Sequence, residues 1–452
     1  MKLSRKNIGS VSDFISLPDY APESLEPGIL HLGVGAFHRA HQCLYYDELA
    51  RAGETNCGVF GVSFNSSHLQ RTLKVQDNLY IHSRVGNEIS HRVIGCILGI
   101  ASLKTGVQMA MDLFEKPNLK LVTLTVTEKA YVEESPVIDF LIEGLRRRKN
   151  HDYPLVICSC DNLLNNSARL GYLIKQKLEA DIDFSEWVND RVSFPSSVVD
   201  SITPRTSSLD YGKICKDPGV EDDVPVVCEN YRSWIIESVP LEIDLAKVGV
   251  TYVSSIEPYQ QLKLRILNGA HSLIAYGGML LGYKTVYEVM QDNMFKALVK
   301  KFMGGMLSTI ADLPDVSGTE YIKNTLERFN NPMIEHGLRQ IGEDGFSKLS
   351  QRVKPVLEKT AGVKEKKILS VPLVLWGIYE WRKVHEKTGL SPSEHVNEDF
   401  RQKISETGSE SGLEDIIVDL FFVEEVREDI SSSLHLFERL GARGFLETLL
   451  AV

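Results

Sequence analysis

Short apolar runs alternate with segments of helical periodicity through the first half of the chain, and this alternation is the strongest constraint on its fold. Two of the runs are rich in β-branched residues, and each is followed by a helix-like or loop-like stretch. Strands that alternate with helices form parallel βαβ units, so the pattern predicts a doubly wound parallel sheet. The apolar runs occupy residues 28–33, 58–63, 119–127 and 154–159, and the helix-like segments occupy residues 36–51, 136–148 and 167–180.

Two features depart from this alternation. Residues 80–85 and 89–97 flank the turn dipeptide Gly86-Asn87, which predicts a β-hairpin inserted into the α/β part. From about residue 258 onward, nearly every segment has helical periodicity. We therefore expect an α/β domain over residues 1–257 and an all-helical domain over residues 258–452, a division that suits a chain of 452 residues.

The composition excludes several classes of function. A net charge of −11 argues against nucleic-acid binding, which needs a basic surface. No apolar stretch follows the basic N-terminus, and the longest apolar segments are interrupted by polar residues or too short to cross a bilayer. Most of the seven cysteines lie within apolar runs without the spacing of a disulfide framework. We expect a cytoplasmic protein with reduced cysteines and no membrane segment, either a monomer or a small homo-oligomer.

A glycine-rich turn, Gly33-Val34-Gly35-Ala36, joins the first predicted strand to the first predicted helix. A dinucleotide-binding fold places its phosphate turn at this point, because glycines let the backbone approach the pyrophosphate. The third glycine of the usual G-x-G-x-x-G pattern is replaced by His38. The turn alone therefore leaves two interpretations open, a phosphate turn and an ordinary strand–helix turn.

The residues around this turn leave two further questions open. The second predicted strand ends without the acid that binds a free ribose 2′-hydroxyl, so Asn65 or Ser66 would take that role. Because no acid is present to repel a 2′-phosphate, NADP(H) stays an alternative to NAD(H). His31, His38 and His41 suggest a metal site, but packing and hydrogen bonding around the turn explain them better.

The segment from Gln261 to Ser272 carries Lys263, Asn268 and His271 within one long apolar helix. At about 100° per residue, Asn268 lies roughly 140° and His271 roughly 80° around the helix from Lys263, so all three share one side. A lysine in a buried helix is disfavoured as a cation, and its neutral amine can accept a proton from an alcohol. Asn268 can donate to the developing alkoxide. The alternative is an amphipathic helix with a solvated lysine.

Short ordered motifs are spread over most of the chain. They are Gly33-Val-Gly-Ala-Phe-His-Arg-Ala-His-Gln42, Thr125-Val-Thr-Glu-Lys129, Ser159-Cys-Asp-Asn162-Leu, Val199-Asp200-Ser-Ile-Thr-Pro204, Lys263-x4-Asn268-x2-His271, Arg328-Phe-Asn-Asn-Pro332 and Asp344-Gly-Phe-Ser-Lys348. Taken together, these motifs resemble those of the polyol-specific long-chain dehydrogenases, the mannitol 2-dehydrogenase and fructuronate reductase family. The resemblance spans most of the chain, and it implies a Rossmann-like, doubly wound N-terminal domain followed by a mainly α-helical C-terminal domain.

The resemblance also implies roles for individual residues. Lys263 would be the general base, without a metal, while Asn268 and Asn162 would polarise the reacting oxygen. Residues 1–257 would bind the dinucleotide and residues 258–452 the substrate. The implied substrate-binding residues are His271, Val199, Asp200 and Lys348, and the implied cofactor-binding residues are Gly33, Gly35, Ala36, Phe37, Asn65, Thr127, Glu128 and Lys129.

Three departures from the family pattern bear on these roles. Gln260 stands where the family often has a glutamate that handles the released proton. The second strand lacks the acid of strictly NAD-dependent relatives, which bears on the preference between cofactors. The segment from Cys228 to Trp234 keeps the usual tryptophan but differs beside it.

The sequence favours an NAD(H)-dependent oxidoreductase that moves a hydride at C2 of a linear polyol, in the manner of D-mannitol and D-fructose. The alternative substrate is an aldonate, D-mannonate, whose carboxylate would need a cation such as Arg205, Arg352 or Lys348. A remote alternative is a non-catalytic nucleotide- or sugar-binding protein, which the intact Lys263, Asn268 and His271 disfavour.

Overall fold

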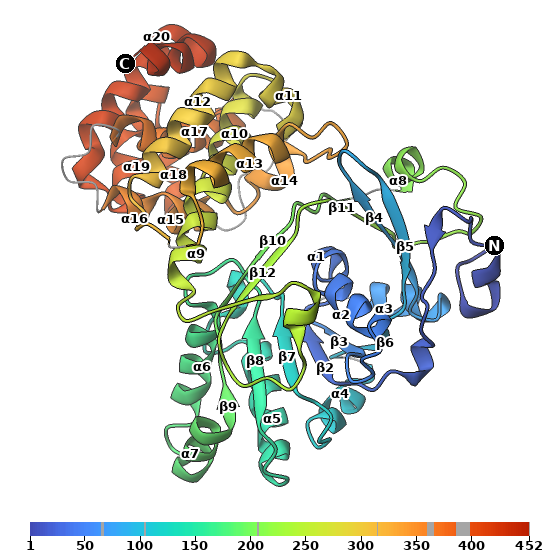
Figure 1. The fold of residues 1–452 in the computed structure, drawn as a ribbon. Coiled ribbons are helices and arrows are strands. Elements are labelled where there is room, and N and C mark those ends of the chain that lie inside the picture. Colours follow the sequence, from blue (N-terminus) through green and yellow to red (C-terminus); the bar gives the residue numbers. More distant parts are fainter. Residues whose placement is uncertain are drawn as a thin grey trace. The chain divides into compact units, whose positions relative to one another are not determined.

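The chain forms two compact units, Met1–Glu257 and Pro258–Val452 (Figure 1). The computed structural model describes residues 1–64, 67–103, 105–205, 208–313, 315–358, 366–385 and 398–451. The first unit is built on a parallel sheet and the second is mainly helical, as the sequence predicts.

Six parallel strands form the main sheet of the first unit, in the order β6-β3-β2-β7-β8-β9. Every residue of β2, β3, β7 and β8 is buried, which explains why these strands read as continuous apolar runs. The strands are β2 (Ile29–Leu32), β3 (Val59–Ser63), β6 (Ile97–Ser102), β7 (Leu121–Leu124), β8 (Leu155–Ser159) and β9 (Val192–Ser193). The helices between them are α1 (Ala36–Ala40), α2 (Gln42–Arg51), α3 (His68–Val75), α4 (Val107–Leu113), α5 (Pro136–Lys149), α6 (Asn166–Lys177) and α7 (Ile182–Arg191).

The predicted helix over residues 36–51 is two helices, because the backbone breaks at His41. The φ and ψ angles of His41 are −111° and −77°, outside the regular helical values. Its ring bonds through Nε2 to the carbonyl oxygen of Ser233 at 2.9 Å. Apolar residues continue at helical spacing across the break, so periodicity alone does not reveal it.

Two smaller sheets accompany the main one. The predicted hairpin is confirmed, since β4 (Tyr80–Val85) pairs antiparallel with β5 (Ser90–Ile94). The prediction carried its second strand through residue 97, whereas Ile97 begins β6 of the main sheet. The hairpin lies in a four-stranded sheet with β1 (Ile15–Ser16) and β11 (Val226–Glu229). The third sheet contains β10 (Ser197–Asp200), β12 (Ser233–Glu237) and β13 (Thr251–Val253).

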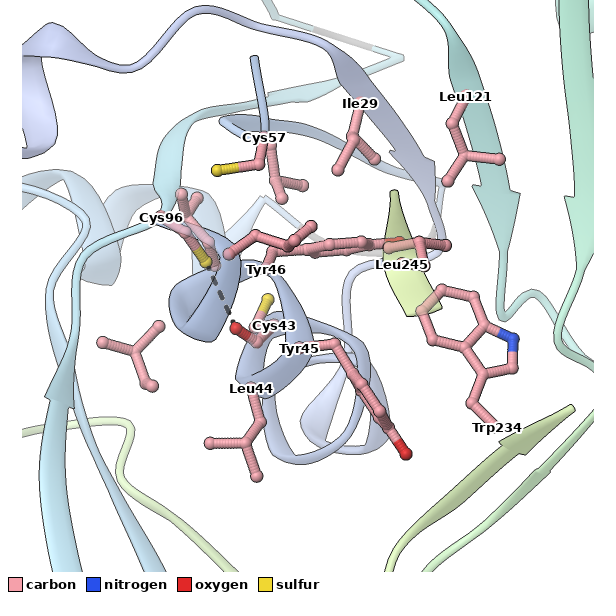
Figure 2. Packing of buried hydrophobic residues seen from close by; sticks show 14 of the residues in the cluster. Ile29, Cys43, Leu44, Tyr45, Tyr46, Cys57, Cys96, Leu121, Trp234 and Leu245 are labelled. Atoms are coloured by element: carbon pink, nitrogen blue, oxygen red, sulfur yellow. Dashed lines mark hydrogen bonds between the residues drawn. The ribbon is translucent and has the colours of Figure 1, made fainter. Parts of the chain in front are cut away.

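A buried cluster packs α2 against one face of the main sheet (Figure 2). Trp234 contacts the rings of Tyr45 and Tyr46 edge-on, with centroids 5.5 and 6.0 Å away. Cys96 donates a weak hydrogen bond to the carbonyl oxygen of Cys43 at 3.5 Å, drawn as a dashed line in Figure 2. All seven cysteines are buried and free, as predicted, so they act as small core residues.

The second unit packs its helices around α10 (Gly269–Leu280), whose residues are buried from Gly269 through Gly278. Helices α12, α14, α15 and α17 contact it. None of the described helices is long and apolar enough to cross a membrane. The other elements are α9 (Glu257–Leu262), the π-helical segment η5 (Lys263–Asn268), α11 (Val286–Gln291), α12 (Asn293–Leu307), α13 (Gly318–Phe329), α14 (Leu338–Gly342), α15 (Gly345–Arg352), α16 (Lys354–Leu357), α17 (Lys366–His385), α18 (Glu398–Glu406), α19 (Glu414–Phe421) and α20 (Arg427–Ala451).

A buried arginine on α5, Arg148, secures the loops that lead into β7 and β8. Burial lowers the pKa of its guanidinium to about 10, so it stays charged at neutral pH. Five backbone carbonyl oxygens accept its N–H groups and replace the water that it loses. They belong to Phe114 (3.0 Å), Lys116 (3.2 Å), Leu119 (2.7 Å), Tyr153 (3.0 Å) and Pro154 (2.7 Å).

We expect Arg148→Met to lower the free energy of unfolding by about 3 kcal/mol, because it leaves buried carbonyl groups unpaired. The neighbouring Arg147 makes only partly exposed ion pairs, so Arg147→Met should cost less than about 1 kcal/mol. Urea denaturation followed by circular dichroism measures both. Equal midpoints for the two variants would contradict this role of Arg148.

Candidate active site

The glycine turn after β2 approaches the end of β7 very closely. Gly33 has a φ of +90°, and a Cβ atom there would lie 2.3 Å from the carbonyl oxygen of Thr125. Gly35 has an extended backbone, and a Cβ there would meet only the Gly33 oxygen at 3.8 Å. Gly33 is therefore required by the turn itself, whereas Gly35 leaves its backbone open to a ligand. Ala36 and Phe37 begin α1 directly after the turn.

A cavity of about 640 Å³ opens at the carboxyl ends of β2, β3 and β7. Open α/β sheets bind ligands at this edge, and the volume lies in the usual range of roughly 300–1,000 Å³ for small-molecule pockets. The residues present fit a dinucleotide, because the open Gly35 backbone faces the same cavity. Four of the predicted cofactor residues line it, namely Gly33, Gly35, Thr127 and Lys129.

Other predicted cofactor residues have different positions. Glu128 lies between Thr127 and Lys129 in a short 3-10 turn. Asn65 lies outside the described residues, so its predicted contact with the ribose stays a prediction. The cavity is also lined by His68 and Leu69 at the start of α3, which the sequence analysis did not single out because they belong to no motif.

Thr127 adopts a backbone conformation that is nearly exclusive to glycine, with φ of 71° and ψ of 162°. Asp161, two residues after the end of β8, holds this turn in place. Its carboxylate accepts the backbone N–H groups of Val126 at 3.2 Å and Thr127 at 2.8 Å, and the hydroxyl of Tyr131 at 2.8 Å. Burial raises the pKa of Asp161 to about 6. Asp161 is a site residue that was not predicted, although it directly precedes Asn162 in the Ser159-Cys-Asp-Asn162 motif.

Histidine side chains fill the space behind the glycine turn. The rings of His31 and His38 stack with centroids 3.4 Å apart and an interplanar angle of 8°. His31 bonds through Nδ1 to the Thr123 hydroxyl at 2.8 Å and through Nε2 to the Thr125 hydroxyl at 2.9 Å. Burial lowers the pKa of His31 to about 3, so the ring is neutral. These contacts agree with the interpretation that the histidines pack and form hydrogen bonds around the turn. His38 occupies the position of the third glycine in the usual pattern, where a glycine allows close packing of helix against strand, and its ring stacks on His31 instead.

Three of the predicted substrate or oxyanion residues belong to the first unit. Asn162 lies in the loop after β8 and is exposed within this chain. Val199 and Asp200 end β10, where Asp200 pairs in register with Ser233 of β12, and both are buried.

Lys263, Asn268 and His271 lie on one continuous helix in the second unit, and they are 8%, 6% and 6% exposed. From Lys263 to Asn268 the helix is a π-helix, which the sequence analysis treated as α. A π-helix closes its hydrogen bonds over five residues, so residues five apart lie nearer to one face than they do in an α-helix. The angle of about 140° expected from α-helical geometry is therefore wrong, and the π turn brings Lys263 and Asn268 closer in direction.

Polar atoms without hydrogen-bond partners gather on this helix. Asn268 Nδ2 and His271 Nε2 are buried and have no partner within the described part of the chain. The His271 ring packs against Phe329, with centroids 4.4 Å apart, and against His336, with centroids 5.1 Å apart. Burial lowers the pKa of His271 well below its usual value, and the proximity of the titratable His336 ring lowers it further.

Cationic side chains from two other elements surround His271. The charges of Arg352, Arg328 and Lys348 also lower its pKa. Arg352, at the end of α15, donates from Nη1 to the Asn268 carbonyl oxygen and to the Ser272 hydroxyl, each at 3.1 Å. Lys348 donates from Nζ to the Ile341 carbonyl oxygen at 2.9 Å. Of the three candidate cations for a substrate carboxylate, Arg352 therefore contacts the helix that carries Asn268, and Lys348 acts on His271 through its charge. Arg205 is an exposed residue of the first unit.

Two family descriptions match this chain along most of its length. The mannitol dehydrogenase Rossmann domain matches residues 27–248, and the mannitol dehydrogenase C-terminal domain matches residues 255–429. The chain belongs to the mannitol dehydrogenase family. As a member of the mannitol dehydrogenase family, it is an oxidoreductase of the kind that acts on CH–OH groups.

Individual relatives agree with this assignment. The uncharacterized oxidoreductase YdfI of Escherichia coli is 32% identical, over 75% of this chain and 76% of its own length. Mannitol 2-dehydrogenase of Emericella nidulans is 30% identical, over 80% of this chain and 81% of its own length. The Pseudomonas fluorescens mannitol 2-dehydrogenase, solved as a ternary complex with NAD and D-mannitol, superposes with a TM-score of 0.89 at 26% identity and covers both chains completely.

The two glycines of the turn give a matched pair of variants. Gly35→Ala should leave the melting temperature unchanged but weaken NADH binding by about tenfold or more, because the new Cβ occupies the space that a pyrophosphate needs. Gly33→Ala should instead lower the melting temperature, because its Cβ collides with backbone. Fluorescence titration with NADH and thermal unfolding measure the two effects. Unchanged NADH affinity in Gly35→Ala would contradict the assignment of this turn.

Proposed function

We propose that this member of the family oxidises a secondary alcohol at C2 of a linear hexitol of the D-mannitol type to the ketose, and catalyses the reverse reduction. One observation carries the proposal. A buried helix presents Lys263 together with two buried nitrogens, Asn268 Nδ2 and His271 Nε2, for which the described residues offer no hydrogen-bond partner. Buried polar groups without partners are costly, and the hydroxyl groups of a polyol would satisfy them.

The first unit would supply the cofactor site. The residues proposed to hold the dinucleotide are those of the glycine turn and of the Thr127–Lys129 turn, with Ala36 and Phe37 at the start of α1. Bound oxidised nicotinamide supplies the acceptor for the hydride that leaves C2. NAD(H) is the favoured form. NADP(H) is the alternative, because neither Ser63, which ends β3, nor Phe64, which follows it, carries an acidic group that would repel a 2′-phosphate.

Lys263 would act as the general base. Its neutral amine accepts the hydroxyl proton while the C2–H bond breaks with its electron pair, and a C=O bond forms. Asn268 and Asn162 donate N–H groups to the oxygen as it gains negative charge. Gln260, which is buried on α9, does not accept a proton at neutral pH, so the proton leaves Lys263 by another route. A lysine base needs no metal ion.

The surroundings of His271 favour one second candidate, an aldonate such as D-mannonate. A carboxylate on the substrate requires a cationic partner, and the charges of Arg328, Lys348 and Arg352 all act on His271. Val199 and Asp200 stay proposed contacts of the sugar chain under either candidate.

Replacing the proposed base should remove turnover and leave cofactor binding intact. We expect Lys263→Met to lose most of kcat while its affinity for NADH changes little, because the amine acts on the alcohol. Asn268→Ala should raise the barrier by about 2.7–4 kcal/mol if it acts as an oxyanion donor. The control is Lys300→Met, which changes an exposed lysine of α12. A Lys263→Met enzyme with near-normal rates at neutral pH would exclude Lys263 as the base.

A panel of polyols and aldonates, each assayed with NAD and with NADP, decides between the candidate substrates. We expect D-mannitol to be oxidised faster with NAD than with NADP, and we expect EDTA to leave the rate unchanged. Absorbance of the reduced cofactor follows each reaction. Oxidation of D-mannonate without oxidation of D-mannitol would reverse the order of the two candidates, and loss of activity with EDTA would contradict a metal-free base.

A further inference from the structure

His336 lies in the loop between α13 and α14, at a fixed position beside the catalytic helix. Its backbone N–H donates to the Ile334 carbonyl oxygen at 2.8 Å, and its carbonyl oxygen accepts from Val286 N–H at 3.0 Å. The adjoining residue Gly337 forms an isolated antiparallel bridge with Thr285. These contacts join the loop to the start of α11, so the backbone at His336 is fixed by hydrogen bonds from both its N–H and its carbonyl group.

The ring of His336 carries a buried polar atom that lacks a partner. Its Nδ1 has no hydrogen-bond partner within the described part of the chain, and neither does Nε2 of the neighbouring His271. The two rings meet edge-to-face, with centroids 5.1 Å apart and an interplanar angle of 82°. Asn268 Nδ2 is a third such atom on the same helix as His271. A buried group without a partner costs about 1–3 kcal/mol, so the two nitrogens of the His271–His336 pair, with Asn268 Nδ2 one turn away from His271, favour a polar ligand here.

Both imidazoles are neutral at physiological pH. Burial lowers the pKa of His336 to about 4, and the charge of Lys348 adds to this effect. Burial also lowers the pKa of His271 well below its usual value. A neutral imidazole carries one donor and one acceptor nitrogen, and a hydroxyl group can donate and accept at once. Paired neutral imidazoles therefore match uncharged hydroxyl groups.

We propose that His336 is a second substrate-binding histidine, which together with His271 holds hydroxyl groups of the sugar chain. This inference rests on the proposed function, since it assumes a substrate with several hydroxyls bound beside Lys263. His336 would govern specificity, because a buried nitrogen aimed at a hydroxyl disfavours any substrate that lacks it. Phe329 is buried and packs against the His271 ring, so it forms an apolar wall beside the two histidines.

Two substitutions separate hydrogen bonding from packing. His336→Phe keeps a planar ring against His271 but removes Nδ1, whereas His336→Asn places an amide near the position of Nδ1. We expect His336→Phe to raise KM for the best polyol about tenfold or more, the size of one lost hydrogen bond to a buried group. His336→Asn should recover most of that loss. NADH affinity and melting temperature should stay at the wild-type values in both variants.

Deoxy substrates give a readout that a structural role of His336 would not change. The wild-type enzyme should discriminate against hexitols that lack a single hydroxyl, and His336→Phe should lose that discrimination at one carbon only. A His336→Phe enzyme with unchanged KM and unchanged deoxy discrimination overturns this inference and leaves the proposed function standing. A wild-type enzyme that turns over no polyol or aldonate overturns both.

Discussion

Burying an amine, an amide and an imidazole on one apolar helix is the constraint on which the account of this protein depends. Lys263, Asn268 and His271 are each less than 10% exposed within the packed second unit, so burial removes most of their contact with water. Within the described part of the chain, Asn268 Nδ2 and His271 Nε2 have no hydrogen-bond partner, so keeping them costs stability that a bound polar ligand would recover. The helix geometry also favours one shared binding site, because the π-helical turn directs Lys263 and Asn268 toward a similar side of the helix.

Much of the fold could be predicted from the sequence because buried segments are recognisable by their apolar residues. Strands buried on both faces read as apolar runs, and their alternation with helices fixes a parallel sheet. The missed details depend on tertiary contacts that periodicity does not encode. The helix break at His41 coincides with a hydrogen bond to Ser233, nearly 200 residues away. The predicted hairpin belongs to a separate sheet, and this could not be predicted because its partner strand β11 comes from much later in the chain.

The candidate site was only partly predictable. Motifs led to Gly33, Gly35, Thr127 and Lys129, which line one cavity, and to the Lys263 helix. Asp161 was missed because its role, holding the strained Thr127 turn, exists only once β7 and β8 lie side by side. His336 was missed because a single histidine in a loop belongs to no motif, and only its contact with His271 reveals it. Helical periodicity likewise does not distinguish a π turn from an α turn.

The central claim is that the Lys263 amine takes the proton from the reacting alcohol. Chemical rescue tests this claim most directly. In Lys263→Ala, small primary amines added to the assay should restore polyol oxidation in proportion to the concentration of their free base, with larger rates for stronger bases. NADH binding to the same variant should be intact. A variant that binds NADH normally but gains no activity from any amine, at any pH, would contradict the account.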